Sequence, residues 1–435
     1  MFWCIIMEFI SIKQAMEKGT GQVNIRGWCY RVRNSNKMAF IVLRDSTNII
    51  QCVVEKSKLS EELWNEALKV TMECSLEITG EIKKDERAPT GYEISVSSIK
   101  IIGESDTFPI TKDQSPEFLL DKRHLWLRSR KMTAILKVRS AVFQAIRKFF
   151  NDKGFYEEHS PIFSPTSCEG GSTLFEVKYF DDIMYLTQSW QLYAEAMISS
   201  LEKIYTISPC FRAEKSKTSR HLSEFWMAET EIAWYKFDDI MKNAEDLVAF
   251  IVKYVLEHNE EELKFLGQDI EKLKNIKAPF PRVTYTEVLE ILKKDGLKVE
   301  WGKDLRTIEE DAIVKHYEKP VIITNYPKKI MAFYKPKDPK NPETALCFDM
   351  IAPEGYGEII GGSERDTNIE EMKKALIAQG EKPEKYEWYF DTRRYGKVPH
   401  SGYGLGVERV IAWLCKSDNI KDTIPFPRTM LRMTP

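Results

Sequence analysis

A hairpin signal in residues 211–234 restricts the possible folds more than any other part of the chain. One apolar run ends at Phe211, and a second begins with Glu224-Phe225-Trp226-Met227-Ala228. Small and hydroxyl residues interrupt the apolar pattern between them, as the loop of a β-hairpin requires. The sequence therefore predicts two antiparallel strands joined by a polar tip.

The predicted tip is basic and carries unusual charges where the first strand should end. Four of its side chains are cationic or titratable: Lys215, Lys217, Arg220 and His221. Arg212 stands close to Glu214 at the strand end, and such residues are rarely buried unless they are paired. This grouping predicts a cradle for a polyphosphate. The alternative is a solvated hairpin tip, which many α+β proteins have.

Length and composition are those of a globular protein of two or three domains. The chain has 435 residues, of which 43% are hydrophobic and 30% charged, and its net charge is -2. Any basic surface for nucleic acid must therefore be local. The eight cysteines form no CxxC pair, which argues against zinc and redox motifs and fits a reducing cytoplasm. The apolar start lacks the basic region of a signal peptide, and Met7 is an alternative start.

Residues 20–105 read as five short strands with one helix among them. The strands are expected at 22–26, 39–44, 49–54, 75–78 and 92–101, and the helix at 60–70. This order is typical of a small closed barrel that binds oligonucleotides. Residues 26–44 contain five basic residues, no acid and three interleaved aromatic residues, which suits single-stranded RNA. The alternative is a solvated strand face with aromatic residues in the core.

The rest of the chain predicts a larger α+β unit. An apolar stripe at helical spacing covers 131–150, and a strand follows that ends at Pro161. Small polar residues at 164–177 predict a loop that closes as a lid. Helices are expected over 237–258 and 283–294, and a strand pair over 321–324 and 330–334.

Two further stretches carry candidate chemistry. Asp349 and Glu358 stand at the ends of two strands joined by a Pro/Gly turn, where a hairpin would bring them together as oxygen ligands for Mg²⁺. Acids at strand ends are also common on surfaces. Near the C-terminus, a strand with glycine at 402, 404 and 406 leads into a helix with Arg409 in its first turn, so the backbone can pass close to a ligand.

Together these stretches resemble the class II aminoacyl-tRNA synthetases of the aspartyl/asparaginyl subgroup. Phe-Arg-Ala-Glu with Arg-His-Leu and Glu-Phe (211–225) is similar to motif 2, the helix and strand of 131–161 to motif 1, and Gly-Leu-Gly-Val-Glu-Arg-Val (404–410) to motif 3. The barrel segment 27–51 resembles the anticodon-binding domain. The resemblance covers nearly all of residues 20–435.

The resemblance implies a fold, a set of domains and a reaction. The fold is α+β: an antiparallel sheet flanked by helices, with an N-terminal OB-fold β-barrel. The domains would be 1–105 (anticodon-binding), 106–128 (linker) and 129–435 (catalytic, with a variable insertion within about 260–320). The enzyme would use ATP and Mg²⁺ to form an aminoacyl-adenylate and then transfer the amino acid to the tRNA 3′ end. Motif 1 implies a homodimer through 131–161.

The resemblance also assigns roles to residues. Arg212 would hold the α-phosphate of ATP, and His221 and Arg409 the outer phosphates, with Arg220 beside them. Phe225 would stack on the adenine, Glu214 would contact the adenine or the tRNA terminus, and Asp349 and Glu358 would bind magnesium. The amino-acid site would contain Glu169, Gln188, Gln191 and Arg365. In the barrel, Phe40 would stack on the middle uridine of the anticodon, and Arg33 and Gln51 would hold and read it.

Asparagine is the expected amino acid, with tRNA(Asn) as its acceptor. Aspartyl enzymes of the subgroup carry a lysine in the string that here reads Gln191-Leu192-Tyr193-Ala194. Loss of one cation from a buried pocket disfavours a second carboxylate. The alternatives are an aspartyl enzyme, a synthetase-derived asparagine synthetase, which the barrel argues against, and a non-catalytic RNA-binding paralogue, which should have lost Arg212, Glu358 or Arg409.

Overall fold

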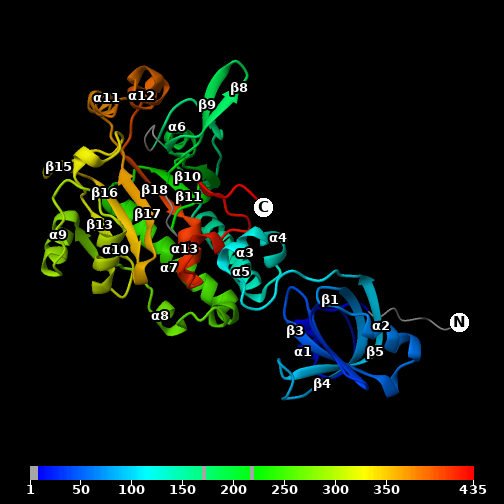
Figure 1. The fold of residues 1–435 in the computed structure, drawn as a ribbon. Helices are drawn as coiled ribbons and strands as arrows, with labels where there is room; N and C mark the ends of the chain where they lie inside the picture. The colour runs from blue at the N-terminus through cyan, green and yellow to red at the C-terminus, as the bar shows by residue number, and fades with distance from the viewer. Residues whose placement is uncertain (1–7, 169–172, 216–219) are drawn as a thin grey trace. The chain divides into compact units, whose positions relative to one another are not determined.

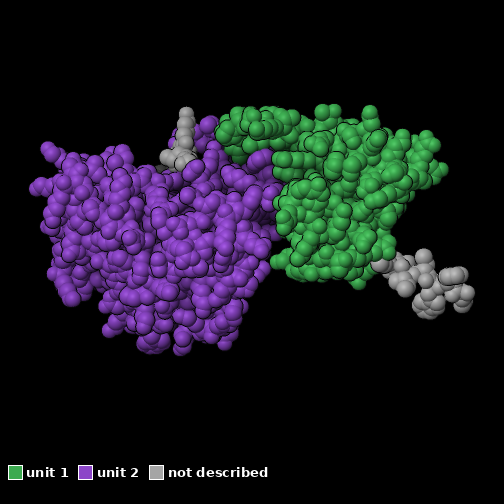
Figure 2. All heavy atoms as spheres, turned by 90° about the horizontal axis from the view of Figure 1, so that it is seen from below, with its two compact units in different colours: residues 1–120 green, residues 121–435 purple. Residues whose placement is uncertain are grey.

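The computed structural model describes residues 8–168, 173–215 and 220–435. The chain divides into two compact units between Leu120 and Asp121. Figure 2 colours the two units separately.

The first unit is a closed five-stranded barrel with the strand order β1-β2-β3-β5-β4 (Figure 1). Its strands are β1 (Gly21–Asn34), β2 (Met38–Arg44), β3 (Ile49–Glu55), β4 (Ser75–Lys84) and β5 (Tyr92–Gly103). Helix α1 (Ile12–Lys18) precedes them, and α2 (Glu61–Leu68) lies between β3 and β4. Alternate residues fill the barrel, such as Ala39, Ile41 and Leu43 on β2, because successive strand residues face opposite sides. The expected oligonucleotide-binding barrel is confirmed.

The segment expected to link the units contains two short helices, α3 (Pro116–Asp121) and α4 (Arg123–Trp126). Arg123 is 1% exposed, although arginine is rarely buried without partners. Its guanidinium donates to the backbone oxygens of Lys421, Ile424 and Pro425. This buried cation fastens the start of the second unit to the C-terminal part of the chain.

The second unit is built on an eight-stranded sheet with the order β12-β13-β16-β17-β18-β11-β10-β6. Its strands are β6 (Tyr156–Glu157), β10 (Lys203–Phe211), β11 (Glu224–Ala233), β12 (Arg282–Thr284), β13 (Val321–Thr324), β16 (Cys347–Ala352), β17 (Gly357–Glu364) and β18 (His400–Gly406). The outer pairs β6–β10 and β12–β13 are parallel, and the five central pairings are antiparallel. The expected α+β fold with an antiparallel central sheet is confirmed.

One face of this sheet is covered by helices and the other is left for polar side chains. The main hydrophobic core joins the sheet to α5 (Arg130–Asp152), α7 (Phe237–Phe265) and α13 (Val407–Leu414). Strand β18 shows the division: Tyr403 and Leu405 are buried in this core, while Gly402 and Gly404 approach side chains of the opposite face. A strand with glycine at alternate positions therefore leaves room on one face only.

The remaining helices and strands lie outside the central sheet. They are β7 (Phe163–Ser164), β8 (Glu176–Tyr179), β9 (Asp182–Leu186), α6 (Gln191–Leu201), α8 (Ile270–Lys274), α9 (Tyr285–Lys294), α10 (Thr307–Ile313), β14 (Lys337–Asp338), β15 (Asn341–Ala345), α11 (Ile369–Ala378) and α12 (Glu387–Arg394). The helices expected at 131–150, 237–258 and 283–294 are confirmed by α5, α7 and α9.

The strand expected at 330–334 is wrong. The structure has a 3-10 turn at Lys328–Ile330 and then a loop. Phe333 and Tyr334 are each 2% exposed and pack in a cluster with residues of α11 and α12. The apolar run is thus explained by burial of a loop and not by strand pairing.

No helix in the described part of the chain is long and apolar enough to cross a membrane. Seven cysteines lie in described segments, and all of them are buried free thiols.

Candidate active site

The hairpin predicted from residues 211–234 is formed by β10 and β11, in register from Lys203 opposite Ile232 to Phe211 opposite Glu224. Arg212 follows β10 directly, and its backbone N–H donates to the oxygen of Ser223 at 3.0 Å. The hairpin therefore continues for one residue beyond the strands. It delivers Arg212 to the polar face of the sheet together with Phe225, over whose ring the guanidinium lies at 5.4 Å.

A first cavity collects all the residues that the resemblance assigns to ATP. Its lining includes Arg212, Glu214, Arg220, His221, Phe225, Glu358 and Arg409. They come from the β10–β11 hairpin, from β17 and from the first turn of α13, which are far apart in the chain. The structure thus brings these seven predicted residues together. Of the tip residues, 216–219 lie outside the described part of the chain.

Charges in this cavity are held by specific partners. Arg220 donates from Nη2 to both oxygens of Asp311 on α10, at 2.8 and 3.1 Å. Arg409 donates from Nη1 to the backbone oxygen of Glu358 at 2.5 Å. Burial and the nearby charge of Arg409 lower the pKa of His221, so its imidazole is a neutral hydrogen-bonding group near pH 7.

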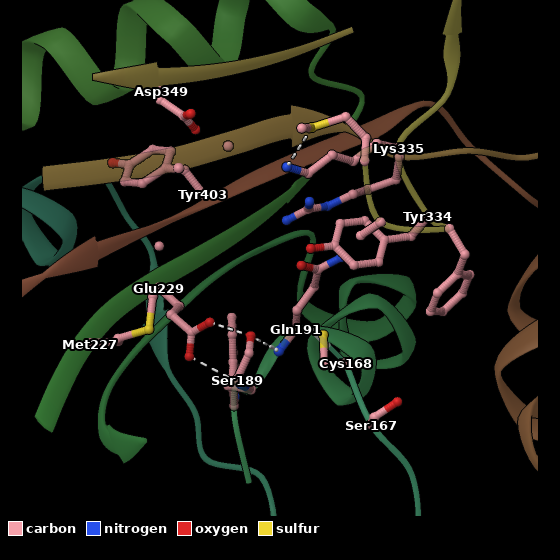
Figure 3. Close-up of a pocket in the computed structure, with 18 of the residues that line it drawn as sticks. Ser167, Cys168, Ser189, Gln191, Met227, Glu229, Tyr334, Lys335, Asp349 and Tyr403 are labelled. Atoms are coloured by element: carbon pink, nitrogen blue, oxygen red, sulfur yellow. Dashed lines mark hydrogen bonds between the residues drawn. The ribbon is translucent and has the colours of Figure 1, made fainter. Parts of the chain in front are cut away.

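A second cavity of about 390 Å³ adjoins the first (Figure 3). Arg212, Met227, Glu358 and Gly404 line both cavities, so the two spaces share a wall at Arg212. Figure 3 shows Asp349 and Lys335 at its upper side and Glu229 and Ser189 at its lower side. The volume suits a small polar molecule placed next to a phosphate in the first cavity.

Two carboxylates on β16 and β17 form a candidate cation site. A Cβ atom built on Gly361 would lie 3.0 Å from Oε1 of Glu358 and 3.5 Å from Oδ1 of Asp349, so both carboxylates lie over this glycine. Burial and the charge of Glu358 raise the pKa of Asp349 well above its ordinary value. Burial and the same charge raise the pKa of Glu310 to about 7. Asp304 lines the second cavity as well. Hard oxygen donors that repel one another fit a divalent cation such as Mg²⁺.

An ion pair forms part of the second cavity's wall. Arg365 donates from Nε and Nη2 to the carboxylate of Glu231 at 3.0 and 2.8 Å, and both side chains are almost fully buried. Because the guanidinium is bound bidentately, its charge is largely balanced by the protein itself. A Cβ on Gly402 would lie 2.1 Å from Glu231 Oε2 and 2.6 Å from Arg365 Nη2, so this glycine makes room for the pair.

Of the other residues expected to bind the amino acid, one lines the second cavity, one holds the neighbouring loop and one lies outside the described residues. Gln191 begins α6, lines the second cavity and donates from Nε2 to Glu195 at 2.9 Å. Gln188 is buried and bridges the flanks of the 164–177 loop: it accepts from the N–H of Cys168 and donates to Thr173 Oγ1. Glu169 lies outside the described residues.

The predicted anticodon residues share one outer face of the barrel. Arg33 pairs with Phe40 across β1 and β2, and its guanidinium lies over the Phe40 ring at 5.3 Å. Gln51 on β3 lies opposite Val42, two residues from Phe40 and therefore on the same face. The Gln51 amide donates to Glu93 at 3.1 Å.

Sequence reasoning missed several residues of the site. Glu229 accepts from the hydroxyl of Ser189 and from the N–H of Trp190 at 3.0 Å, and it lines the second cavity. The sequence also did not identify four further acids in or near the second cavity as candidate residues: Glu195, Glu231, Asp304 and Glu310. A pattern of acids on alternate β11 positions (Glu229 and Glu231) was the one signal available, because buried strand acids need a reason.

The comparisons with known proteins agree along the chain. Residues 115–430 match the family model of tRNA synthetases class II (D, K and N), and residues 23–102 match that of the OB-fold nucleic acid binding domain. The asparagine--tRNA ligase of Thermoplasma acidophilum is 48% identical over 95% of this chain and 96% of its own length.

Solved structures give the same result. The asparaginyl-tRNA synthetase of Pyrococcus horikoshii, complexed with asparaginyl-adenylate, is 44% identical with a TM-score of 0.95, covering 99% of this chain and 100% of its own. The aspartyl tRNA synthetase of Entamoeba histolytica is 26% identical with a TM-score of 0.85, covering 100% of this chain and 94% of its own.

Proposed function

The chain belongs to the class II tRNA synthetases of the D, K and N group, and we propose that its two adjoining cavities attach asparagine to tRNA(Asn). ATP and asparagine first form asparaginyl-adenylate and pyrophosphate. The terminal 3′-hydroxyl of the tRNA then attacks the adenylate. The observation that supports this proposal is that Arg212 lines both cavities, so a phosphate bound in one would lie beside an amino acid bound in the other.

The first step joins two anions, so the site must neutralise charge where they meet. Arg212 borders both cavities and is our candidate for the α-phosphate, with its planar guanidinium binding two oxygens. Arg409, in the first turn of α13, and neutral His221 bind the outer phosphates and favour departure of pyrophosphate. No protein nucleophile is required, because the substrate carboxylate itself attacks.

Phe225 and Glu214 form the proposed base-binding end of the ATP cavity. The ring of Phe225 is held by the Arg212 guanidinium and offers a flat apolar face to the adenine. Glu214 accepts hydrogen bonds from the adenine amino group or from the tRNA terminus.

Magnesium is the proposed cation for Asp349 and Glu358. When bound there, a magnesium ion would supply positive charge that stabilises the phosphate oxygens of ATP. The two carboxylates supply the oxygen ligands, and Asp304 and Glu310 add negative potential beside them. In this arrangement Glu358 also holds Arg409 through its backbone oxygen, so the same residue serves the cation and the phosphate site.

The second cavity favours an amide over a carboxylate. Glu231 can accept from the side-chain NH₂ of asparagine, and Arg365 can donate to its carbonyl oxygen. An aspartate side chain would instead meet the Glu231 carboxylate, while Arg365 is already neutralised by that same group. Ala194 is 0% exposed at the position where aspartyl enzymes place a lysine, so no second cation compensates there. Gln188, Gln191 and Glu169 complete the proposed amino-acid site.

The barrel is the proposed reader of the anticodon. Phe40 stacks on the middle base and Arg33 holds the backbone. Because the amide nitrogen of Gln51 is engaged by Glu93, its carbonyl oxygen is left to accept from the uridine edge.

A homodimer is also proposed, through the segment 131–161. Most of the apolar stripe of α5 lies in the core of the unit itself. The support is instead at the sheet edge: β6 is the outermost strand, and Tyr156 on it is 56% exposed. We place the enzyme in the cytoplasm, where buried free thiols stay reduced.

ATP–pyrophosphate exchange with purified protein tests the amino-acid specificity. We expect exchange with asparagine and at most about a hundredth of that rate with aspartate. A site arranged to hydrogen-bond an amide binds a carboxylate poorly, because its own acceptor is left without a donor. Exchange with aspartate alone would identify an aspartyl enzyme. Exchange with neither would favour the non-catalytic RNA-binding paralogue.

A further inference from the structure

Beside the amino-acid cavity lies a buried cluster of charged side chains, of which the proposed mechanism uses only Glu231 and Arg365. Its members come from five places in the chain: Glu195 on α6, Glu231 on β11, Arg365 after β17, Arg393 on α12 and His400 on β18. Each of them is at most 5% exposed. Ionisable groups are buried at this density only when they are closely paired.

Glu195 is the hub of the cluster and is ionised. Its Oε2 accepts from Arg393 Nη2 and from the hydroxyl of Tyr389, and its Oε1 accepts from Gln191 Nε2 at 2.9 Å. Burial alone would raise the pKa of Glu195, but the charges of Arg393 and His400 lower it below its ordinary value. A carboxylate with this many donors has no proton to give to a further partner.

His400 therefore carries a hydrogen on both ring nitrogens. Its Nδ1 lies 2.9 Å from the backbone oxygen of Val398, and its Nε2 lies 2.9 Å from Oε2 of Glu195. A carbonyl oxygen and an ionised carboxylate can only accept, so each ring nitrogen must donate. The geometry describes an imidazolium and not either neutral tautomer.

Glu195, Glu231 and His400 also place one potential ligand atom each within 4.8 Å of one another, as a metal site would. The positive charge that balances these two acids already comes from arginine side chains, however. Arg393 occupies Glu195, and Arg365 occupies Glu231 bidentately. The cluster is therefore an ion-pair network of the protein itself.

Two contacts connect this network to the cavity. Because Glu195 accepts from the Gln191 amide nitrogen, it turns the Gln191 carbonyl oxygen away from itself. Burial and the charge of Glu195 raise the pKa of Glu231, and the charges of Arg365 and His400 oppose that rise. A protonated Glu231 would donate a hydrogen bond and could then accept an aspartate carboxylate. His400 thus favours the ionised form that rejects aspartate.

We propose that imidazolium His400 is a buried positioning residue: through Glu195 it orients the Gln191 amide, and its charge offsets that of Glu195 beside Glu231. His400 thereby keeps Glu231 ionised and sustains the preference for asparagine over aspartate. This inference rests on the proposed function of the cavity. The charged or titratable groups around His400 are Glu195, Glu231, Glu364, Arg365, Tyr389 and Arg393.

The protonation state of His400 can be measured without an enzyme assay. Full-length protein labelled with ¹⁵N-histidine is examined by long-range ¹H–¹⁵N NMR at pH 7.5, where an ordinary imidazole with a pKa of about 6.5 is mostly neutral. One imidazolium pattern should be present in the wild-type protein and absent from His400→Gln. A neutral tautomer pattern for His400 at this pH would overturn the proposal, whatever the enzyme's substrate.

Exchange kinetics then test the consequence. His400→Gln keeps a donor for Glu195 but removes the charge, so a purely structural role predicts wild-type behaviour. We expect KM for asparagine to rise about tenfold with a smaller change in kcat, and the asparagine/aspartate ratio to fall further as the pH is lowered from 8 to 6. His316→Gln is the matched control, because His316 pairs with Asp295 on the surface at 2.7 Å.

A second variant, Glu195→Gln, keeps the proposal testable if His400→Gln does not fold. Glu195→Gln removes the hub charge and should also raise KM for asparagine about tenfold or more. Unchanged KM and discrimination in both folded variants, judged by thermal unfolding, would overturn the proposal. Failure of the wild-type enzyme to exchange with asparagine would instead refute the proposed function and leave the NMR result on His400 to be judged separately.

Discussion

At the scale of single residues, the site depends on a cation that lies between the two cavities and on a glycine that leaves room for a buried ion pair. Arg212 is the one cationic side chain among the described residues that line both cavities. Its guanidinium is steadied by the face of Phe225. A planar, delocalised cation can bind two phosphate oxygens from this position, whereas an ammonium group provides a single point of charge.

Arg212→Lys should therefore retain the positive charge but lose the planar group that can bind two phosphate oxygens. We expect kcat for exchange to fall by about 10²–10³, the size found when one donor to a transition-state oxyanion is removed. Steady-state exchange with saturating asparagine and ATP measures this. Arg87→Lys, on an exposed arginine of the barrel, is the control. A loss of less than about threefold in Arg212→Lys would remove Arg212 from the proposed α-phosphate role.

Gly402 illustrates the opposite requirement, an absent side chain. A Cβ there would lie 2.1 Å from Glu231 Oε2 and 2.4 Å from the backbone oxygen of Thr230, and backbone cannot yield cheaply. Gly402→Ala should destabilise the enzyme by about 3 kcal/mol or more through overpacking, and weaken asparagine binding by displacing the Arg365–Glu231 pair. Thermal unfolding and titration with asparagine measure the two effects.

Gly406→Ala is the matched control for that substitution. The nearest atoms to a Cβ at this position belong to the Arg409 side chain at 3.8 Å, so the methyl group has room. Equal melting temperatures for the two variants would contradict the steric account of Gly402.

The residues of the proposed ATP cavity lie in short, recognisable strings, so the sequence could predict that they belong to one site. Arg212, His221 and Arg409 each stand beside an apolar strand or helix pattern that fixes their position. Glu195 and Asp304 have no such local signal. Their roles arise from partners far away in the sequence, such as His400 for Glu195, and a single sequence does not reveal which distant charges will meet.

At the scale of elements, α10 links an uninformative stretch of sequence to the phosphate site. This helix lies within the segment 260–320, whose role the sequence did not reveal. Asp311 on it binds Arg220 through two hydrogen bonds, and Glu310 lies 3.9 Å from the same guanidinium. The helix thereby holds Arg220 at the edge of the ATP cavity.

Asp311→Asn should release Arg220 from that position. The neutral amide offers the guanidinium one uncharged oxygen in place of two charged ones, so we expect KM for ATP to rise about three- to tenfold with kcat less affected. Exchange measured against ATP concentration distinguishes the two constants. Glu290→Gln on the exposed face of α9 is the control. A lower KM in Asp311→Asn would mean that Asp311 competes with phosphate for Arg220.

Elements with clear periodicity were predictable, and elements decided by packing were not. The barrel strands and helices α5, α7 and α9 follow their patterns of two and of about 3.6 residues. The apolar residues at 330–334 were misread because a buried loop and a short strand have the same composition. Phe333 and Tyr334 are buried against α11 and α12, an arrangement that depends on helices 40 to 60 residues further along.

At the scale of the whole molecule, the two proposed activities, anticodon recognition and adenylate formation, fall in different units. The barrel of the first unit carries the proposed anticodon face, and every residue of the two cavities belongs to the second unit. Adenylate formation needs only ATP and asparagine. A change confined to the anticodon face should therefore leave the first step intact and affect only the use of tRNA.

Phe40→Ala tests this division. Removing the ring takes away one stacked base, worth about 1–3 kcal/mol, so KM for tRNA(Asn) in aminoacylation should rise by about 5- to 150-fold while ATP–pyrophosphate exchange stays at the wild-type rate. Ile102→Ala, an exposed residue at the end of β5, should change neither activity. A parallel loss of exchange in Phe40→Ala would show that the barrel takes part in the chemical step. Unchanged tRNA charging would mean that the anticodon is read by another face of the barrel.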